Sequence, residues 1–313
     1  MQIRTDLALE AREMINEKKS EKMKENNSLP EGMFVDTTEN EYVIITEIQI
    51  KSDEAMNAIG KKKGKYITLE LKQSLLDTID IQENTAMILA EEIKKVINET
   101  AKNSPQFMIV GLGNRNITAD SLGPKVTDKI VVTRHIKNLQ NKKNNENLGI
   151  DNRLGNICAI APGVMGVTGI ETSEIIKGMI STIKPDLLLV IDALASRKAT
   201  RVNSTIQISD TGIVPGSGVG NHRMELSKEV LGIPVISVGV PTVVDALTLV
   251  KDILDVEERD FTELENNDNI ANMIVTPKNI DIAIERISDV LASAINMAIH
   301  QGFKMQEINE YLI

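Results

Sequence analysis

Two aspartates occupy the positions of this sequence best suited to acid–base chemistry. Asp192 follows the apolar run 187–191, and Asp120 lies in the loop after a second apolar run, 107–110. In an open α/β sheet, ligands bind beyond the carboxyl ends of the strands, so we expect both carboxylates in one cleft. Burial and like charge would raise the pKa of one, so that one carboxylate activates water while the other supplies a proton. Each also has a structural explanation, Asp120 as a helix N-cap and Asp192 as a carboxylate held by backbone donors.

Other nucleophiles and metal ligands fit less well. Cys158 lies within an apolar run, where a thiol usually packs as a small hydrophobic group. Ser217 has Pro215 two residues before it, where the nucleophile elbow of hydrolases requires glycine. The three histidines show no metal-binding spacing. His222 nevertheless follows a glycine-rich loop, so a metal site that joins it to the two aspartates is an alternative to an unaided acid pair.

The start of the loop after 107–110 is similar to a dinucleotide-binding motif. Gly111 and Gly113 fit that motif, but Asn116 stands where its third glycine should be. The following helix also begins too late for a pyrophosphate to bind at its N-terminus. We therefore expect no nucleotide cofactor.

The composition excludes several classes of protein. The 313 residues carry a formal charge of −10, with no Trp, four Phe and three Tyr, whereas nucleic-acid-binding surfaces gather Lys, Arg and stacking aromatics. The basic run 61–65 is expected to be a solvated loop. A single Cys, no secretory signal and no apolar stretch of about 18 residues predict a cytoplasmic protein that does not cross a membrane.

Periodicity predicts the elements that position the two aspartates. From residue 106 onward, short apolar strands alternate with helical segments, which indicates an α/β fold whose sheet is covered by helices on both faces. The strands are expected at 107–110, 157–161, 187–191 and 234–240, and the helices near 121–140, 170–183, 222–231, 242–254 and 279–300. The run 205–209 alternates instead, which predicts an edge or antiparallel strand. Upstream, helices are expected at 7–24 and 85–97 and strands at 42–48 and 66–71.

Several blocks of the sequence resemble the spore germination protease family of endospore-forming bacteria. They are residues 4–11, 111–114 with Asp120, 122–125, 162–172, 191–195, 202–210, 215–221 and 240–246. The resemblance implies a three-layer α/β sandwich with a central mostly parallel sheet, related to the hydrogenase-maturation proteases, and a small N-terminal β-containing extension. It also implies a single peptidase domain over 7–313, with an N-terminal region at 7–104 and a catalytic core at 105–313.

The activity implied by the resemblance is that of an atypical aspartic endopeptidase whose catalytic residues match Asp120 and Asp192. Members of the family begin the degradation of small acid-soluble spore proteins when a spore germinates, and they assemble as homotetramers in the spore core. The resemblance thus implies no cofactor, no direct nucleic-acid partner and no membrane partner. The alternatives are the metallopeptidase with His222 and a noncatalytic binding module that retains the fold.

The resemblance further implies a zymogen that removes its own N-terminal pro-segment. The family cuts between an acidic and an apolar residue, and Asp6-Leu7 offers that pair, so residues 1–6 are expected to be the pro-segment. Glycine-rich loops are expected to shape the substrate cleft. The residues expected there are Gly111, Gly113, Asn114, Gly163, Gly166, Thr168, Gly169, Glu171, Gly216, Ser217 and Gly218.

Overall fold

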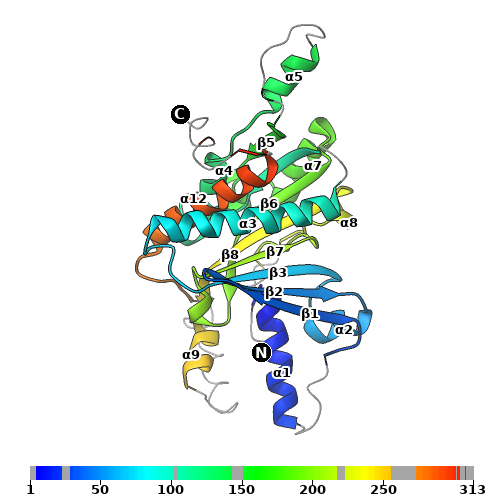
Figure 1. Ribbon diagram of the computed structural model, residues 1–313. Helices are drawn as coiled ribbons and strands as arrows, with labels where there is room; N and C mark the ends of the chain where they lie inside the picture. The colour runs from blue at the N-terminus through cyan, green and yellow to red at the C-terminus, as the bar shows by residue number, and fades with distance from the viewer. Residues whose placement is uncertain are drawn as a thin grey trace.

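A mixed β-sheet forms the centre of the protein (Figure 1). The computed structural model describes residues 5–22, 29–101, 105–142, 151, 153–216, 223–254, 273–300, 302–303 and 307. Within these residues, nine strands join in the order β1-β2-β3-β7-β8-β6-β4-β5, and β9 pairs with β8. Their bounds are β1 (Met33–Glu39), β2 (Val43–Ile50), β3 (Gly64–Leu71), β4 (Gln106–Gly111), β5 (Asn156–Ile160), β6 (Leu187–Ser196), β7 (Thr205–Ser209), β8 (Val235–Asp245) and β9 (Ile274–Val275).

The sheet has a parallel part and an antiparallel part. Strands β5, β4, β6 and β8 run parallel, and they contain the apolar runs that predicted buried strands. Strands β1, β2, β3 and β7 are antiparallel, and β7 joins them to β8. The expected N-terminal β-containing extension is therefore present, and it continues the same sheet.

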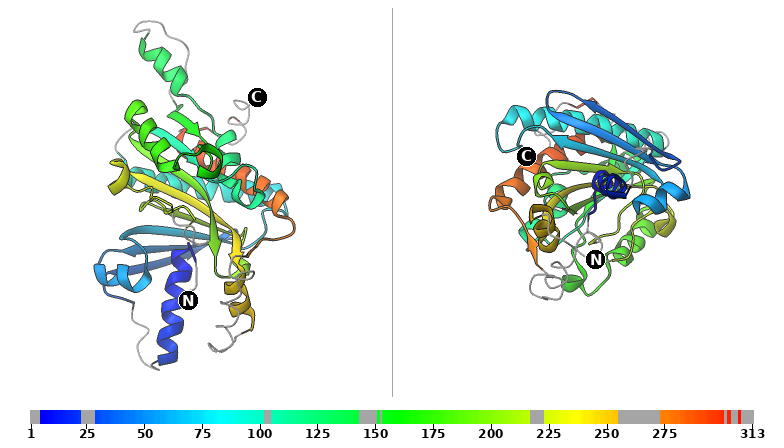
Figure 2. Two further views of the ribbon diagram at one scale, coloured as in Figure 1. Left: turned by 180° about the vertical axis from the view of Figure 1, so that it is seen from behind. Right: turned by 90° about the horizontal axis from the view of Figure 1, so that it is seen from below.

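Helices cover both faces of the sheet (Figures 1 and 2). One face packs against α3 (Ile79–Thr100), α4 (Leu122–Asp128) and α12 (Ile280–Ile299) through a large aliphatic cluster. The other face packs against α7 (Thr172–Ile183) and α8 (Lys228–Leu231) over the parallel strands, and against α1 (Ala8–Lys22) and α2 (Asp53–Ile59) over the antiparallel ones. The remaining short elements are η1 (Thr118–Asp120), α5 (Arg134–Lys142), α6 (Met165–Thr168), η2 (Ala199–Arg201) and α9 (Ala246–Leu254). In the described part of the chain, no helix combines the length and apolarity needed to cross a membrane. The predicted three-layer α/β sandwich with a central mostly parallel sheet is confirmed.

Alternation along β7 gives one face of the sheet a polar strip. Ile206 and Ile208 point into the aliphatic cluster beneath α3 and α12, so Gln207 points to the opposite face. Gln207 pairs with Gly239 on β8, and Gly239 pairs with Asp192 on β6. Paired residues share a face, so Asp192 and Gln207 lie in one row, between the apolar cluster under α7 and the one under α1.

Several local predictions differ from the structure. The strand at 205–209 is antiparallel as expected, but it lies inside the sheet, between β3 and β8. The segment 121–140 holds two helices, and residues 242–245 continue β8 instead of starting α9. The helix expected near 222–231 is wrong for residues 223–227, because Leu226 exchanges backbone hydrogen bonds with Ile213. Strand β1 was not predicted, since its sequence is polar and mostly exposed.

Candidate active site

Asp192 lies on β6 at the point where this strand extends beyond β4. The pairing of β4 with β6 ends at Gly111 and Ile191, so Asp192 is the first residue past it. The strand itself continues to Ser196 alongside β8, further than the sequence predicted. The Asp192 side chain is buried, with 6% of the residue exposed, and its Oδ1 accepts a 3.0 Å hydrogen bond from the N–H of Ala193. A buried carboxylate therefore stands beside the end of β4, where the loop carrying Asp120 begins.

The loop after β4 folds tightly around Asp120. The N–H of Leu112 donates to the carbonyl of Ile191 at 2.8 Å, which fixes the start of the loop on β6. Gly113 has φ = 112°, and a Cβ there would lie 2.0 Å from the carbonyl oxygen of Asp120, so only glycine fits. The N–H of Asn114 donates to Asp120 Oδ2 at 2.7 Å. The N-cap explanation of Asp120 is wrong, because its side chain is held by this loop and the residue lies in η1.

Close packing of α4 on β4 supports the same loop. A Cβ on Gly111 would lie 2.1 Å from the carbonyl oxygen of Gly123, and a Cβ on Gly123 would lie 2.3 Å from the carbonyl oxygen of Leu112. These two glycines let the helix approach the strand at backbone distance. Gly111 thereby sets where the loop with Asp120 leaves the sheet.

The two carboxylates influence each other electrostatically. Burial raises the pKa of Asp192 well above its ordinary value of 3.8, and the nearby carboxylates of Asp120 and Asp6 raise it further. Burial also raises the pKa of Asp120, while the hydrogen bond from the N–H of Asn114 opposes this shift. Asp192 therefore keeps its proton to higher pH than Asp120, and between their two titrations the pair holds a single proton.

Residues 5–8 cross the face of the sheet beside Asp192. The N–H of Asp6 donates to the carbonyl of Ala195 at 3.0 Å, and the N–H of Ala195 donates to Asp6 Oδ2 at 2.9 Å. The carbonyl of Asp6 accepts hydrogen bonds from Lys61 Nζ at 2.9 Å and from Gln207 Nε2 at 3.2 Å. Leu7 is fully buried. The peptide bond between Asp6 and Leu7 is therefore held next to Asp192 by contacts from three separate parts of the chain.

Lys61 departs from the solvated loop expected at 61–65. Its Nζ also donates to the carbonyl of Thr5 at 3.1 Å. Burial lowers the pKa of Lys61, although the carboxylates of Asp6 and Glu10 oppose this shift. The adjacent Lys62 does match the expectation, because it is exposed and pairs with a glutamate near the surface.

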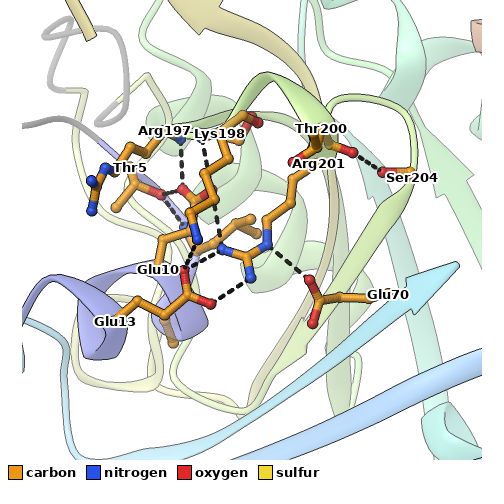
Figure 3. A network of polar contacts seen from close by, with 12 residues as sticks. Thr5, Glu10, Glu13, Glu70, Arg197, Lys198, Thr200, Arg201 and Ser204 are labelled. Atoms are coloured by element: carbon orange, nitrogen blue, oxygen red, sulfur yellow. Dashed lines mark hydrogen bonds and ion pairs between the residues drawn. The ribbon is translucent and has the colours of Figure 1, made fainter. Parts of the chain in front are cut away.

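A network of buried charges fixes α1 against the turn after β6 (Figure 3). Glu10 is fully buried and accepts hydrogen bonds from the backbone N–H groups of Arg197 at 2.6 Å and Lys198 at 3.0 Å. Arg201 donates to both carboxylate oxygens of Glu13, at 2.6 and 2.8 Å. Burial alone would raise the pKa of Glu13, but hydrogen bonds from Arg201 and Lys198 outweigh it and lower this pKa to about 2. Acidic side chains of α1 thus anchor this helix.

Five of the other residues predicted for the cleft lie in one loop at the carboxyl edge of the parallel strands. Gly163, Gly166, Thr168, Gly169 and Glu171 belong to the loop that contains α6 and links β5 to α7. Since β5 runs parallel to β4, this loop leaves the same edge as the Asp120 loop. Gly216 is described and has φ = 73°, whereas Ser217, Gly218 and His222 lie outside the described residues. Among the residues that are described, no three His, Cys, Asp or Glu side chains are grouped so that they could hold a metal ion.

Comparisons with known proteins cover the segments that build this site. A family model described as germination protease matches residues 8–271. The chain belongs to the germination protease family. It is 45% identical to the germination protease of Clostridium acetobutylicum, over 99% of both chains. It is 37% identical to that of Bacillus cereus, over 99% of this chain and 96% of the relative. Among solved structures, it is similar to a NiFe hydrogenase maturation protease from Thermococcus kodakarensis, with 17% identity, a TM-score of 0.31, and coverage of 65% of this chain and 98% of that one.

As a member of the germination protease family, the protein is a protease. Its described site also contains residues that the sequence analysis did not single out. Glu10 could have been found, because it lies three residues after Leu7 and so on the same side of the helix. Gln207 is one of the polar residues of the alternating run 205–209. The alternation indicated which face of the strand Gln207 occupies, but not what its side chain does. Lys61 carried no such signal, since its contacts come from residues more than fifty positions away.

Proposed function

We propose that this germination protease is an atypical aspartic endopeptidase that initiates the degradation of small acid-soluble spore proteins during spore germination. One observation supports it most: the buried Asp192, which interacts with the partly buried Asp120, lies beside the peptide bond between Asp6 and Leu7. Family membership and the sequence resemblance support the substrate, a self-processing zymogen, a homotetramer and a location in the cytoplasm of the spore core.

The different pKa shifts support separate roles for the two acids. Asp120 has the lower pKa of the pair, so its carboxylate accepts a proton from the water whose oxygen attacks the carbonyl carbon. Asp192 keeps its proton to higher pH and donates it to the amine nitrogen as the carbon–nitrogen bond breaks. One proton shared between two carboxylates is therefore sufficient for both steps.

We expect the full-length chain to cleave itself between Asp6 and Leu7, because that bond is fixed next to the acid pair. N-terminal sequencing and intact mass after incubation should show a new terminus at Leu7. The matched control is Asp192→Asn, which should keep its original N-terminus throughout. A new terminus far from Leu7, or processing of the Asp192→Asn chain at the wild-type rate, would contradict the proposal.

We also expect cleavage to persist without divalent metal, since the acid pair supplies both base and acid. After exhaustive treatment with EDTA, the rate of spore-protein cleavage should stay within about twofold of the untreated rate. The opposite result would be loss of activity that added Zn²⁺ or Mg²⁺ restores. That outcome would favour a metallopeptidase in which His222 joins Asp120 and Asp192 as a ligand.

A further inference from the structure

The carbonyl oxygen of Asp6 receives two side-chain donors from distant parts of the chain. Lys61 Nζ reaches it at 2.9 Å from the turn between α2 and β3, and Gln207 Nε2 reaches it at 3.2 Å from β7. A cationic donor and a neutral amide thus converge on one main-chain oxygen. Donors arranged in this way stabilise negative charge that develops on a carbonyl oxygen.

Gln207 also fixes the chain on the far side of Leu7. Its Oε1 accepts a 2.7 Å hydrogen bond from the N–H of Ala8, while its Nε2 binds the carbonyl of Asp6. A single side-chain amide therefore holds the peptide groups on either side of the buried Leu7. The bond between Asp6 and Leu7 cannot shift along the cleft without breaking one of these contacts.

Gln207 lies on the same face of the sheet as Asp192. Gln207 and Asp192 belong to one row, with only Gly239 between them. A Cβ on Gly239 would lie 2.6 Å from the side chain of Leu194, so a larger residue here would force Leu194 to move. The polar strip thus places Gln207 and Asp192 near the same peptide group, which Lys61 reaches from the turn after α2.

We propose that Lys61 and Gln207 form the oxyanion site of this protease. The inference rests on the proposed function, in which Asp120 and Asp192 cleave the bond that follows the carbonyl of Asp6. As water attacks the carbonyl carbon, its proton passes to Asp120 and the carbonyl π electrons move to the oxygen, where Lys61 Nζ and Gln207 Nε2 stabilise the charge. The oxyanion then reforms the carbonyl, the carbon–nitrogen bond breaks, and the amine nitrogen takes the proton of Asp192.

A purely anchoring role does not account for Lys61. Two hydrogen bonds already attach Asp6 to Ala195 on the sheet, one donated by the N–H of Asp6 and one accepted by its carboxylate. Gln207 also already binds the carbonyl of Asp6. Removing an ammonium group from water is costly, and burial accordingly lowers the pKa of Lys61. An ammonium group held against the carbonyls of Thr5 and Asp6 despite that cost is the arrangement expected of a charge-stabilising group.

The test is the single-turnover rate of self-cleavage in the full-length chain, combined with hydrogen exchange at the N–H groups of Ala8 and Ala195. Lys61→Met, and Gln207→Glu, which keeps the acceptor for Ala8 but loses the donor, should each slow cleavage roughly 10²- to 10³-fold. Exchange protection should stay at the wild-type level, because the remaining contacts still hold the segment. Lys62→Met, which removes the adjacent exposed lysine, is the matched control and should cleave at the wild-type rate.

The possible outcomes separate the inference from the proposed function. Wild-type cleavage rates in Lys61→Met and Gln207→Glu would overturn the oxyanion site and leave the acid pair intact. Slow cleavage together with lost protection would also overturn it, since the two residues would then be anchors. Failure of the wild-type chain to cleave at this bond, or cleavage by Asp192→Asn, would instead overturn the proposed function.

Discussion

Asp192→Asn is expected to lower the rate constant for cleavage of a small acid-soluble spore protein by roughly 10³-fold or more, because an amide cannot donate the proton that the leaving amine needs. Asp120→Asn should cause a similar loss, since no carboxylate then accepts the proton of water. The double variant should be scarcely worse than either single one, because the two acids act as a unit. Fragment formation followed by gel or mass spectrometry measures the rate, and circular dichroism checks that each variant is folded.

Asp210→Asn provides a matched control for these two variants. Asp210 is also a partly buried aspartate whose pKa is raised by burial, but it binds the backbone N–H of Lys65 and lies outside the acid pair. Asparagine keeps that acceptor, so cleavage should proceed at close to the wild-type rate. Full activity in both Asp120→Asn and Asp192→Asn would show that the pair is not the catalyst, whatever the fold.

The same Asp192→Asn change should make the protein more stable at neutral pH. The folded state raises the pKa of Asp192 above its ordinary value of 3.8, so its contribution to stability is fully present below that pH. It is lost as the pH rises through the higher pKa of the folded state. Each unit by which the pKa is raised costs the wild type about 1.4 kcal/mol at neutral pH, and the variant avoids this cost.

Urea unfolding of the wild type and of Asp192→Asn at several pH values measures this difference. The gap in the free energy of unfolding should be largest near pH 7 and should shrink as the pH approaches 3.8. Asp289→Asn, which removes a more exposed carboxylate paired with Lys129, should change stability by less than about 1 kcal/mol. A variant no more stable than the wild type at pH 7 would show that the buried carboxyl group carries no such cost.

Much of the fold follows from short-range patterns in the sequence. The apolar run at 187–191 and its counterparts predicted the parallel strands, and alternation at 205–209 placed Ile206 and Ile208 on the buried side of β7. Asp192 could be singled out because it directly follows such a run. These predictions succeeded because a strand buried on both faces is apolar along its length, whereas a strand buried on one face alternates apolar and polar residues.

The rest of the site depends on contacts between distant residues. Lys61 lies in a lysine-rich turn that any pattern would assign to solvent, yet its Nζ binds the carbonyls of Thr5 and Asp6. Strand β1 is polar and exposed, so only its pairing with β2 defines it as a strand. The break at 223–227 likewise depends on the pairing of Leu226 with Ile213. Such long-range contacts leave no periodic pattern of apolar residues in the local sequence, so they become visible only in the folded structure.

The position of β1 at the end of the sheet has a consequence for how molecules meet in a crowded solution. An outermost strand carries N–H and C=O groups without a neighbouring strand, which invites another chain to pair with it and start an aggregate. In β1, Asp36 is charged and exposed, Glu39 pairs with Lys72, and most of the residues are exposed and polar. Charged and polar side chains along an outermost strand disfavour pairing with a second copy, so the polarity that hid β1 from prediction also protects the sheet from uncontrolled growth.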